Sequence, residues 1–212
     1  MKELDLFYKL GKDGLEPTQG YDDDFAMDIY ASKGVLVAPL TFKSVKVPTD
    51  FRTAFDPKEV GNLVALRSGA AANTPLTVTN APGIIEGTYR GEYHVLVRNM
   101  FIDTGLVPFA FNIKGERIAL SAIPKPVLAE ARKNYEAESE LLGYDKLSDV
   151  QENILFKTVV PRGTVYIAKH DRIAQMFFSP KIKPVLKKVD ELPESVRGEG
   201  GFGSSGTTKG GN

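Results

Sequence analysis

Short apolar runs, each ended by turn-forming residues, recur through residues 1–100 of the chain. Val, Ile, Tyr and Phe are frequent inside the runs, and Gly, Pro, Asn or Asp separate them. Such runs predict short strands, and many short strands between turns are typical of an antiparallel sandwich or barrel. The same pattern returns after residue 160, so we expect an all-β domain. The clearest runs read LDLFYKL, GVLVAPL, SVKVP, NLVAL, PLTVTN and YHVLVRN.

A segment rich in Ala, Glu, Lys and Leu interrupts this pattern between residues 124 and 143. Pro126 suits the first turn of a helix, and Gly143 suits the residue just past its end. Ser148 followed by Gln151 has the spacing of a capping box and predicts a second, short helix. Helical spacing places the apolar residues of the first helix on one face, namely Val127, Leu128, Ala131, Tyr135 and Leu142.

These patterns divide the chain into three parts. We expect an α-containing insertion at 105–158 within a β domain formed by 1–104 and 159–196. The β domain keeps enough residues to fold as a unit without the insertion. The alternative is that the helical segment is an ordinary part of an α+β fold. The Gly-rich end, residues 197–212, predicts a flexible C-terminal arm.

Composition excludes several classes of function. The 27 basic and 27 acidic residues give a formal net charge of zero. A protein that holds nucleic acid by phosphate attraction needs a basic surface, so we expect no nucleic-acid partner. The absence of cysteine excludes disulfides, thiolate metal sites and cysteine nucleophiles. No apolar run reaches the ~18 residues that span a bilayer, and the start lacks a secretory signal, so we expect a cytoplasmic protein without a membrane partner.

Two stretches in the first third of the chain carry polar groups that a plain β domain does not need. Asp28 interrupts the apolar pattern AMDIYA, and a buried carboxylate requires a partner. The run Arg67-Ser68-Gly69 joins a guanidinium, a hydroxyl and an unobstructed backbone N–H, which suits a phosphate group. Three adjacent aspartates at 22–24 predict a solvated loop in preference to a cation site.

Two further stretches have similar features. After Asn80, the turn residues and then Gly83, Ile84 and Ile85 predict a hairpin, with Glu86 and Tyr89 three residues apart beside it. In D-R-I-A-Q, strand alternation places Gln175 on one face with the apolar Ile173 and Phe177, so its amide needs a partner or a ligand. The glycines of 198–203 match G-x-G-x-x-G but lack the following helix of a dinucleotide site.

In their order and spacing, these stretches resemble the motifs of the trimeric dUTP pyrophosphatase (dUTPase, deoxyuridine 5'-triphosphate nucleotidohydrolase) family. The family pattern has R-S-G, then N-x-x-G-x-I-D-x-x-Y-R-G-E, then D-R-I-A-Q and a tail R-G-x-G-G-F-G-S-x-G. Arg67, Asn80, Gly83 and Tyr89 keep this register without a gap. The resemblance covers most of 20–100 and 159–206. Some bacteriophage members carry an insertion at the same place, so a phage-like member in a host cytoplasm is expected.

The resemblance implies a jelly-roll-like β fold, a homotrimer with shared active sites, and Mg²⁺-assisted hydrolysis of dUTP to dUMP and pyrophosphate. This reaction limits uracil in DNA and supplies dUMP for thymidylate synthesis. The implied catalytic residues are Glu86 as the base with Arg67 and Gln175 at the phosphates, and Asp28 would hold the metal through water. The implied substrate-binding residues are Ser68, Gly69, Asn80, Gly83, Ile84, Ile85, Tyr89, Arg197, Phe202, Gly203, Ser204 and Ser205.

The chain departs from the family pattern at the water-activating residue, where Glu86 replaces an aspartate. A glutamate is also an able base, because both side chains ionise over nearly the same pH range. Its extra methylene moves the carboxylate by more than ~1 Å, and such a shift can lower a rate on the order of 10²-fold. Either Gly87 gives the hairpin slack, or the enzyme is slow. At His170, where the family usually has a turn glycine, we expect a surface turn.

Two other functions stay open. A nucleotide-dependent regulatory protein would bind dUTP with weak turnover and use 105–158 to contact a protein partner. A dCTP deaminase of the same fold would need R-S-S at the phosphate motif and a differently placed glutamate, and this chain has neither. Release of pyrophosphate from dUTP discriminates the leading function from the regulatory one.

Overall fold

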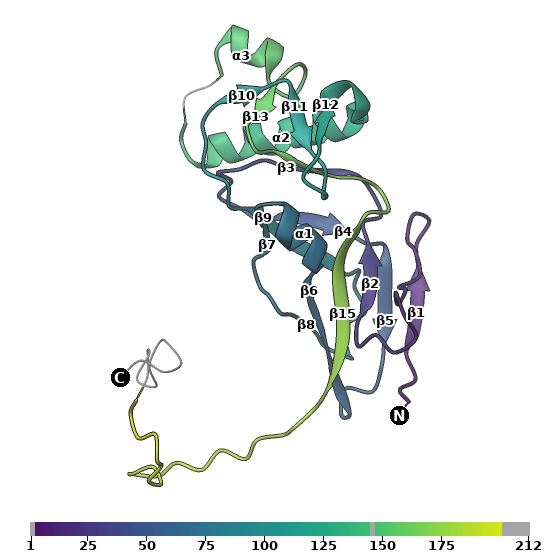
Figure 1. Cartoon of the computed structure of the whole chain (residues 1–212), viewed down its shortest axis with the longest axis vertical. Coiled ribbons are helices and arrows are strands. Elements are labelled where there is room, and N and C mark those ends of the chain that lie inside the picture. The colour runs from purple at the N-terminus through teal and green to yellow at the C-terminus, as the bar shows by residue number, and fades with distance from the viewer. Residues whose placement is uncertain (1–2, 145–146, 201–212) are drawn as a thin grey trace, which may run out of the picture. The chain divides into compact units, whose positions relative to one another are not determined.

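The computed structural model describes residues 3–144 and 147–200. The chain divides into two compact units, Met1–Lys181 and Ile182–Asn212. Within the described ranges, all helices and strands belong to the first unit (Figure 1). No helix in these ranges is long and apolar enough to cross a bilayer.

The elements follow one another as short strands with a helical segment in the middle, as the apolar runs predicted. The strands are β1 (Phe7–Leu10), β2 (Met27–Tyr30), β3 (Val35–Val37), β4 (Val45–Pro48), β5 (Phe51–Ala54), β6 (Val60–Leu66), β7 (Leu76–Val78), β8 (Gly83–Ile85), β9 (His94–Asn99), β10 (Leu106–Val107), β11 (Phe109–Phe111), β12 (Arg117–Ala119), β13 (Val160–Pro161), β14 (Val165–Ile167) and β15 (Arg172–Pro180). The helices are α1 (Ser68–Asn73), the 3₁₀ turn η1 (Leu120–Ala122), α2 (Lys125–Leu141) and α3 (Asp149–Ile154).

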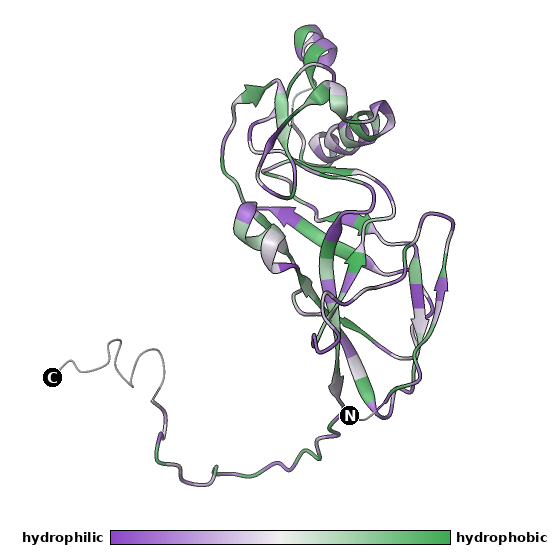
Figure 2. Ribbon diagram, turned by 45° about the vertical axis from the view of Figure 1, so that its right-hand side comes forward, coloured by the Kyte–Doolittle hydropathy of each residue, from purple (hydrophilic) through white to green (hydrophobic). Residues whose placement is uncertain are grey.

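The strands form small sheets around one main core. One sheet has the order β2-β15-β6-β8, a second β4-β9-β7, and a third β12-β11-β14-β3, while β1 pairs with β5 and β10 with β13. Their buried side chains, such as Val47, Val97, Ile167 and Met176, pack into one cluster. Figure 2 shows hydrophobic residues gathered along these strands. The prediction of a mostly β fold is confirmed.

The two helices predicted in the middle of the chain are present. Pro126 lies in the first turn of α2, and Gly143 follows the helix with a left-handed φ of +70°. Ser148 caps α3 in a full capping box with Gln151. These helices were predictable because their start and stop signals are local in sequence.

A second, smaller core holds the helical segment. Leu128 of α2 and Phe156 after α3 are buried there with Leu36 of β3. Because β11 and β12 share a sheet with β14 and β3, strands from 105–158 pair with strands outside that segment. The boundaries of the insertion stay a prediction, since this sheet is continuous across them.

The prediction of a hairpin at Asn80 is wrong, because the strands before and after the turn do not pair with each other. The turn forms, but β7 pairs with β9 and β8 pairs with β6, so the two strands belong to different sheets. The turn therefore carries the chain from one sheet to the other. Turn residues specify a reversal of direction, whereas the partner of each strand depends on the whole fold.

Tyr93 gives a testable link between burial and pH. Its ring is 1% exposed, and its hydroxyl shares a 2.6 Å hydrogen bond with Thr53 Oγ1. Burial raises the pKa of Tyr93 to about 12. Because the folded state holds this proton more tightly than the unfolded state, stability is fully present below pH ~10 and is lost as pH rises toward ~12.

Tyr93→Phe is therefore expected to lower the free energy of unfolding by about 1 kcal/mol at neutral pH, through loss of the hydrogen bond. The difference from the unsubstituted protein should shrink between pH ~10 and ~12, because the variant has no proton to lose. Urea unfolding at several pH values measures this, with the exposed Tyr144→Phe as the control. A difference that stays constant with pH would contradict the account.

Candidate active site

Asp28, a residue of β2, lies at the centre of a cluster of charged side chains from several strands. It is only 5% exposed, although it is a carboxylate. Arg67 Nε donates to Asp28 Oδ1 at 2.8 Å, and Arg172 Nη1 donates to Asp28 Oδ2 at 3.3 Å. Both oxygens of the buried carboxylate therefore have charged donors, which is the condition for burying such a group.

The sheet order explains why these side chains meet. Gln175 of β15 lies between Asp28 of β2 and Ala65 of β6 in register. Residues level across neighbouring strands point to the same face, and Arg67 lies two positions beyond Ala65. Arg67 N also donates to Ile173 O at 3.2 Å, which ties the end of β6 to β15. The structure thus brings Asp28, Arg67 and Gln175, three of the predicted site residues, close together.

The phosphate motif continues from this cluster into α1. Arg67 is the residue before the helix, Ser68 opens it, and no side chain caps this end. The first N–H groups of a helix have no acceptor within the helix, so they can donate to an anion. A Cβ at Gly69 would meet only Arg67 Nη1, at 3.9 Å, so the backbone here is open on that side.

The cluster is suited to an anion. Two guanidinium groups face one carboxylate, so one positive charge is left over. The side chains of Arg67 and Arg172 are 34% and 49% exposed, so part of each guanidinium reaches the surface. A guanidinium has five donors, and Asp28 occupies only some of them. Asp28 therefore orients the two arginines while leaving donors for phosphate oxygens.

The sequence does not identify Arg172 as a partner of Asp28, although the two side chains are hydrogen-bonded in the structure. The resemblance implies only a metal held through water at Asp28, whereas in the structure the guanidinium groups of Arg67 and Arg172 compensate the charge of this carboxylate. The signal for this pairing was an acid in an apolar strand, which requires a nearby cation, but the sequence does not say which cation.

The expected surroundings of Gln175 are also corrected. The register between β15 and β2 shifts between Arg172 and Ala174, so Ile173 and Ala174 are both buried. Gln175 is half-buried, and the bulge places it on the opposite face from Ile173, whereas regular alternation still places it on the face of Phe177. A bulge places two consecutive side chains on one side, which simple alternation cannot predict.

The donor set around Asp28 fits a metal held through water. Among the described residues no three acidic or histidine side chains form a metal cage. Mg²⁺ usually keeps several waters and binds through one or two carboxylates and substrate phosphates. A carboxylate has about four lone-pair sites, and the arginines use two at Asp28, so it can still accept from a metal-bound water.

The predicted uracil-reading residues lie in the turn after β7 and in β8. Asn80 and Ile84 are exposed, Ile85 is half-buried, and Gly83 is buried. A Cβ at Gly83 would come within 3.3 Å of Asn80 Nδ2. Glycine therefore lets the start of β8 lie close to the Asn80 side chain.

Glu86 and Tyr89 follow on a surface loop. Glu86 is exposed, and Tyr89 N donates to Glu86 O at 2.9 Å. Gly87 is buried, and a Cβ there would lie 2.6 Å from Phe55 O. Gly87 thus allows close packing against Phe55. This contact leaves the loop little of the freedom that Gly87 was expected to give for repositioning Glu86.

Within one chain, Glu86 lies far from the arginine cluster. Ile85 is level with Asn62 on β6, five residues before Arg67. At 3.3 Å per residue this separates the two positions by roughly 16 Å along the strand. A base must lie within hydrogen-bond reach of its water, so one copy of the chain does not assemble the whole predicted site.

The predicted arm residues lie in the second unit or beyond the described ranges. Arg197 is exposed, and its Nε donates to Gly200 O at 2.6 Å. The predictions for Phe202, Gly203, Ser204 and Ser205 lie outside the described residues.

Three polar features prove to be structural. Asp24 accepts hydrogen bonds from the N–H groups of Gly20 and Tyr21, so the run of aspartates forms a loop, as predicted. His170 adopts a left-handed φ of +69° in a turn before β15. This conformation explains why glycine suits that position. His94 starts β9 with Nδ1 3.2 Å from Glu92 O.

Fold and cluster together define a mostly β, anion-binding protein, and comparisons with known proteins specify the family. The dUTPase family profile matches residues 142–206. The deoxyuridine 5'-triphosphate nucleotidohydrolase of Mycolicibacterium vanbaalenii is 33% identical over 122 residues, covering 58% of this chain and 75% of that protein. The chain belongs to the dUTPase family.

Solved structures agree with this assignment. A dUTPase of Staphylococcus bacteriophage 80alpha, solved with dUpNHpp, has a TM-score of 0.70 and 27% identity, covering 96% of this chain and 99% of that one. A variant dUTPase of phage phi11 of S. aureus, whose structure describes a structural Mg(II) ion, is similar in fold, with a TM-score of 0.63, 24% identity and coverage of 90% and 99%.

Proposed function

We propose that this chain hydrolyses dUTP to dUMP and pyrophosphate, which would limit uracil in DNA and supply dUMP for thymidylate synthesis. The observation that carries the proposal is the buried Asp28 carboxylate, which orients Arg67 and Arg172 beside Gln175. This cluster offers fixed cationic donors at the place where the family pattern binds phosphates. The relatives named above supply the substrate class.

The phosphate chain would lie along the cluster and the start of α1. Arg67 and the N–H groups at Ser68 and Gly69 would bind phosphate oxygens, and the Gln175 amide would donate to the α-phosphate. Charge moves toward the leaving pyrophosphate as the reaction proceeds. Preorganised donors that meet this developing charge lower the barrier.

Glu86 would act as the general base. Its carboxylate takes a proton from water, the water oxygen bonds to the α-phosphorus, and the bond from the α-phosphorus to the bridging oxygen breaks. Pyrophosphate leaves with the electron pair of that bond. Because Glu86 is exposed and distant from the cluster in its own chain, it would serve the cluster of a neighbouring chain.

Mg²⁺ bound to the triphosphate would neutralise charge on the phosphate oxygens. Asp28 would accept a hydrogen bond from a water of that ion. The ion would thus be positioned by the substrate and a single protein carboxylate.

The turn after β7 would recognise the nucleoside. Backbone groups from Asn80 to Ile85 would read the uracil edge and leave no room for a methyl at carbon 5. Tyr89 would pack under the deoxyribose and exclude a 2′-hydroxyl, because a rigid wall rejects a larger analogue.

A homotrimer would complete each site from several chains. The arm would supply Arg197, Gly203, Ser204 and Ser205 to the β and γ phosphates, and Phe202 would stack over uracil. Such an arm excludes water once substrate is bound.

The direct test is release of pyrophosphate by the purified protein with Mg²⁺. We expect release from dUTP and hardly any from dTTP, which carries the 5-methyl group, or from UTP, which carries the 2′-hydroxyl. Calorimetry with dUTP measures binding in parallel. Tight binding with dUTP unchanged after long incubation would refute the hydrolytic function and favour a regulatory one, in which 105–158 contacts a partner.

A further inference from the structure

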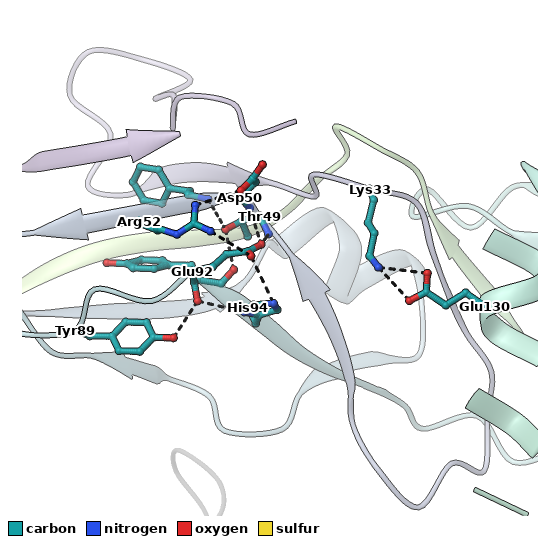
Figure 3. Close-up of polar contacts among 10 residues, drawn as sticks. Lys33, Thr49, Asp50, Arg52, Tyr89, Glu92, His94 and Glu130 are labelled. Atoms are coloured by element: carbon teal, nitrogen blue, oxygen red, sulfur yellow. Dashed lines mark hydrogen bonds and ion pairs between the residues drawn. The ribbon is translucent and has the colours of Figure 1, made fainter. Parts of the chain in front are cut away.

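The Glu92 side chain holds the turn between β4 and β5. Its Oε1 accepts hydrogen bonds from Thr49 N at 3.0 Å and from Asp50 N at 2.8 Å (Figure 3). Asp50 has a left-handed φ of +52°, which is uncommon for a residue other than glycine. Hydrogen bonds to a carboxylate are stronger than those to a neutral group, so Glu92 is a firm anchor.

The other carboxylate oxygen lies between two basic side chains. Glu92 Oε2 is 3.8 Å from Arg52 Nη2 and 3.9 Å from His94 Nε2. Arg52 also pairs with Asp50 at 3.2 Å, so the same turn is held by a second contact. The Glu92 side chain is only 20% exposed, which limits its alternative positions.

The backbone of Glu92 holds Tyr89. The Tyr89 hydroxyl donates to Glu92 O at 3.1 Å, as Figure 3 shows. A Cβ at Gly91 would lie 2.2 Å from this hydroxyl, so the ring packs directly over Gly91. Tyr89 is 44% exposed and therefore depends on these few contacts for its position.

We propose that Glu92 is a positioning residue that sets the discrimination against a ribose 2′-hydroxyl. Its carboxylate fixes the β4–β5 turn, and this anchor fixes the carbonyl that receives the Tyr89 hydroxyl. A ring that is free to shift makes room for one more oxygen, so exclusion depends on the anchor. The inference rests on the proposed function, in which Tyr89 packs under the sugar.

The test compares Glu92→Gln with Glu130→Gln. The first variant keeps an oxygen for the turn but presents an amide NH₂ to Arg52 and His94. The second removes the same charge from a surface ion pair with Lys33, which Figure 3 also shows. The measurement is the ratio of kcat/KM for dUTP to that for UTP. We expect this preference to fall about tenfold in Glu92→Gln and to stay unchanged in Glu130→Gln.

Tyr89→Phe shows whether Glu92 acts through Tyr89. The phenylalanine ring cannot donate to Glu92 O, so adding Glu92→Gln to Tyr89→Phe should change the preference by less than about twofold. Glu92→Asp keeps the charge and shortens the side chain, so an intermediate loss is expected. This variant also serves if Glu92→Gln fails to fold.

Two results would overturn the inference. One is a preference in Glu92→Gln equal to that of the unsubstituted protein, even with a lower melting temperature. The other is a tenfold loss that persists in the Tyr89→Phe background. An unsubstituted protein that hydrolyses dUTP and UTP equally would instead refute the proposed role of Tyr89, so the two failures are distinguishable.

Discussion

Glu86→Gln should lower the turnover of dUTP by about 10²–10⁴-fold and leave dUTP binding nearly unchanged. Glutamine has almost the same shape as glutamate but cannot accept the proton of the attacking water. Glu86 is exposed, and its backbone carbonyl, which accepts from Tyr89 N, is retained in the variant. We therefore expect the variant to fold as the unsubstituted protein does.

Pyrophosphate release gives the turnover, and calorimetry with a non-hydrolysable dUTP analogue and Mg²⁺ gives the binding. Glu130→Gln is a matched control, because it removes one exposed carboxylate of α2. Equal turnover in Glu86→Gln and the control would remove Glu86 from the role of base. A parallel loss of binding would indicate that Glu86 holds the substrate.

Sequence reasoning succeeded where the signal was local. The ends of α2 were predictable because Pro126 and Gly143 act within a turn of their own positions. The hairpin prediction was wrong because the turn after Asn80 does not specify which strands pair with the strands on either side of it. The prediction that Gln175 shares a face with Ile173 was wrong, because the bulge after Arg172 cannot be recognised from the residue pattern.

The candidate site shows the same division. Physical reasoning required a partner for Asp28, but the sequence identified neither Arg67 nor Arg172 as that partner. The contacts of Glu92 could not be predicted from the sequence either, because its partners Thr49 and Asp50 lie more than 40 positions away. The separation of Glu86 from Arg67 became visible only through strand register.

This separation predicts that two inactive variants regain activity when their chains are mixed. Arg67→Gln lacks the phosphate-binding guanidinium, but we expect its amide NH₂ to donate to Asp28 in place of Arg67 Nε and to keep the carboxylate paired. Glu86→Gln lacks the base. We assume that a site takes Arg67 from one chain and Glu86 from another. In an equal mixture, each of these two positions is then unsubstituted in half of the sites, so both are unsubstituted in about one quarter. The mixture should therefore recover about one quarter of full activity.

The experiment refolds the two variants together and measures pyrophosphate release, while native mass spectrometry verifies mixed oligomers. Each variant refolded alone is the control and should stay below about 1% of full activity. Mixed oligomers without recovery would mean that both residues of a site come from one chain. The β8–β6 register opposes that arrangement, since it separates Glu86 from Arg67 by roughly 16 Å or more. Recovery would therefore establish that the catalytic base acts across a subunit boundary, and that a single chain is inactive for geometric reasons.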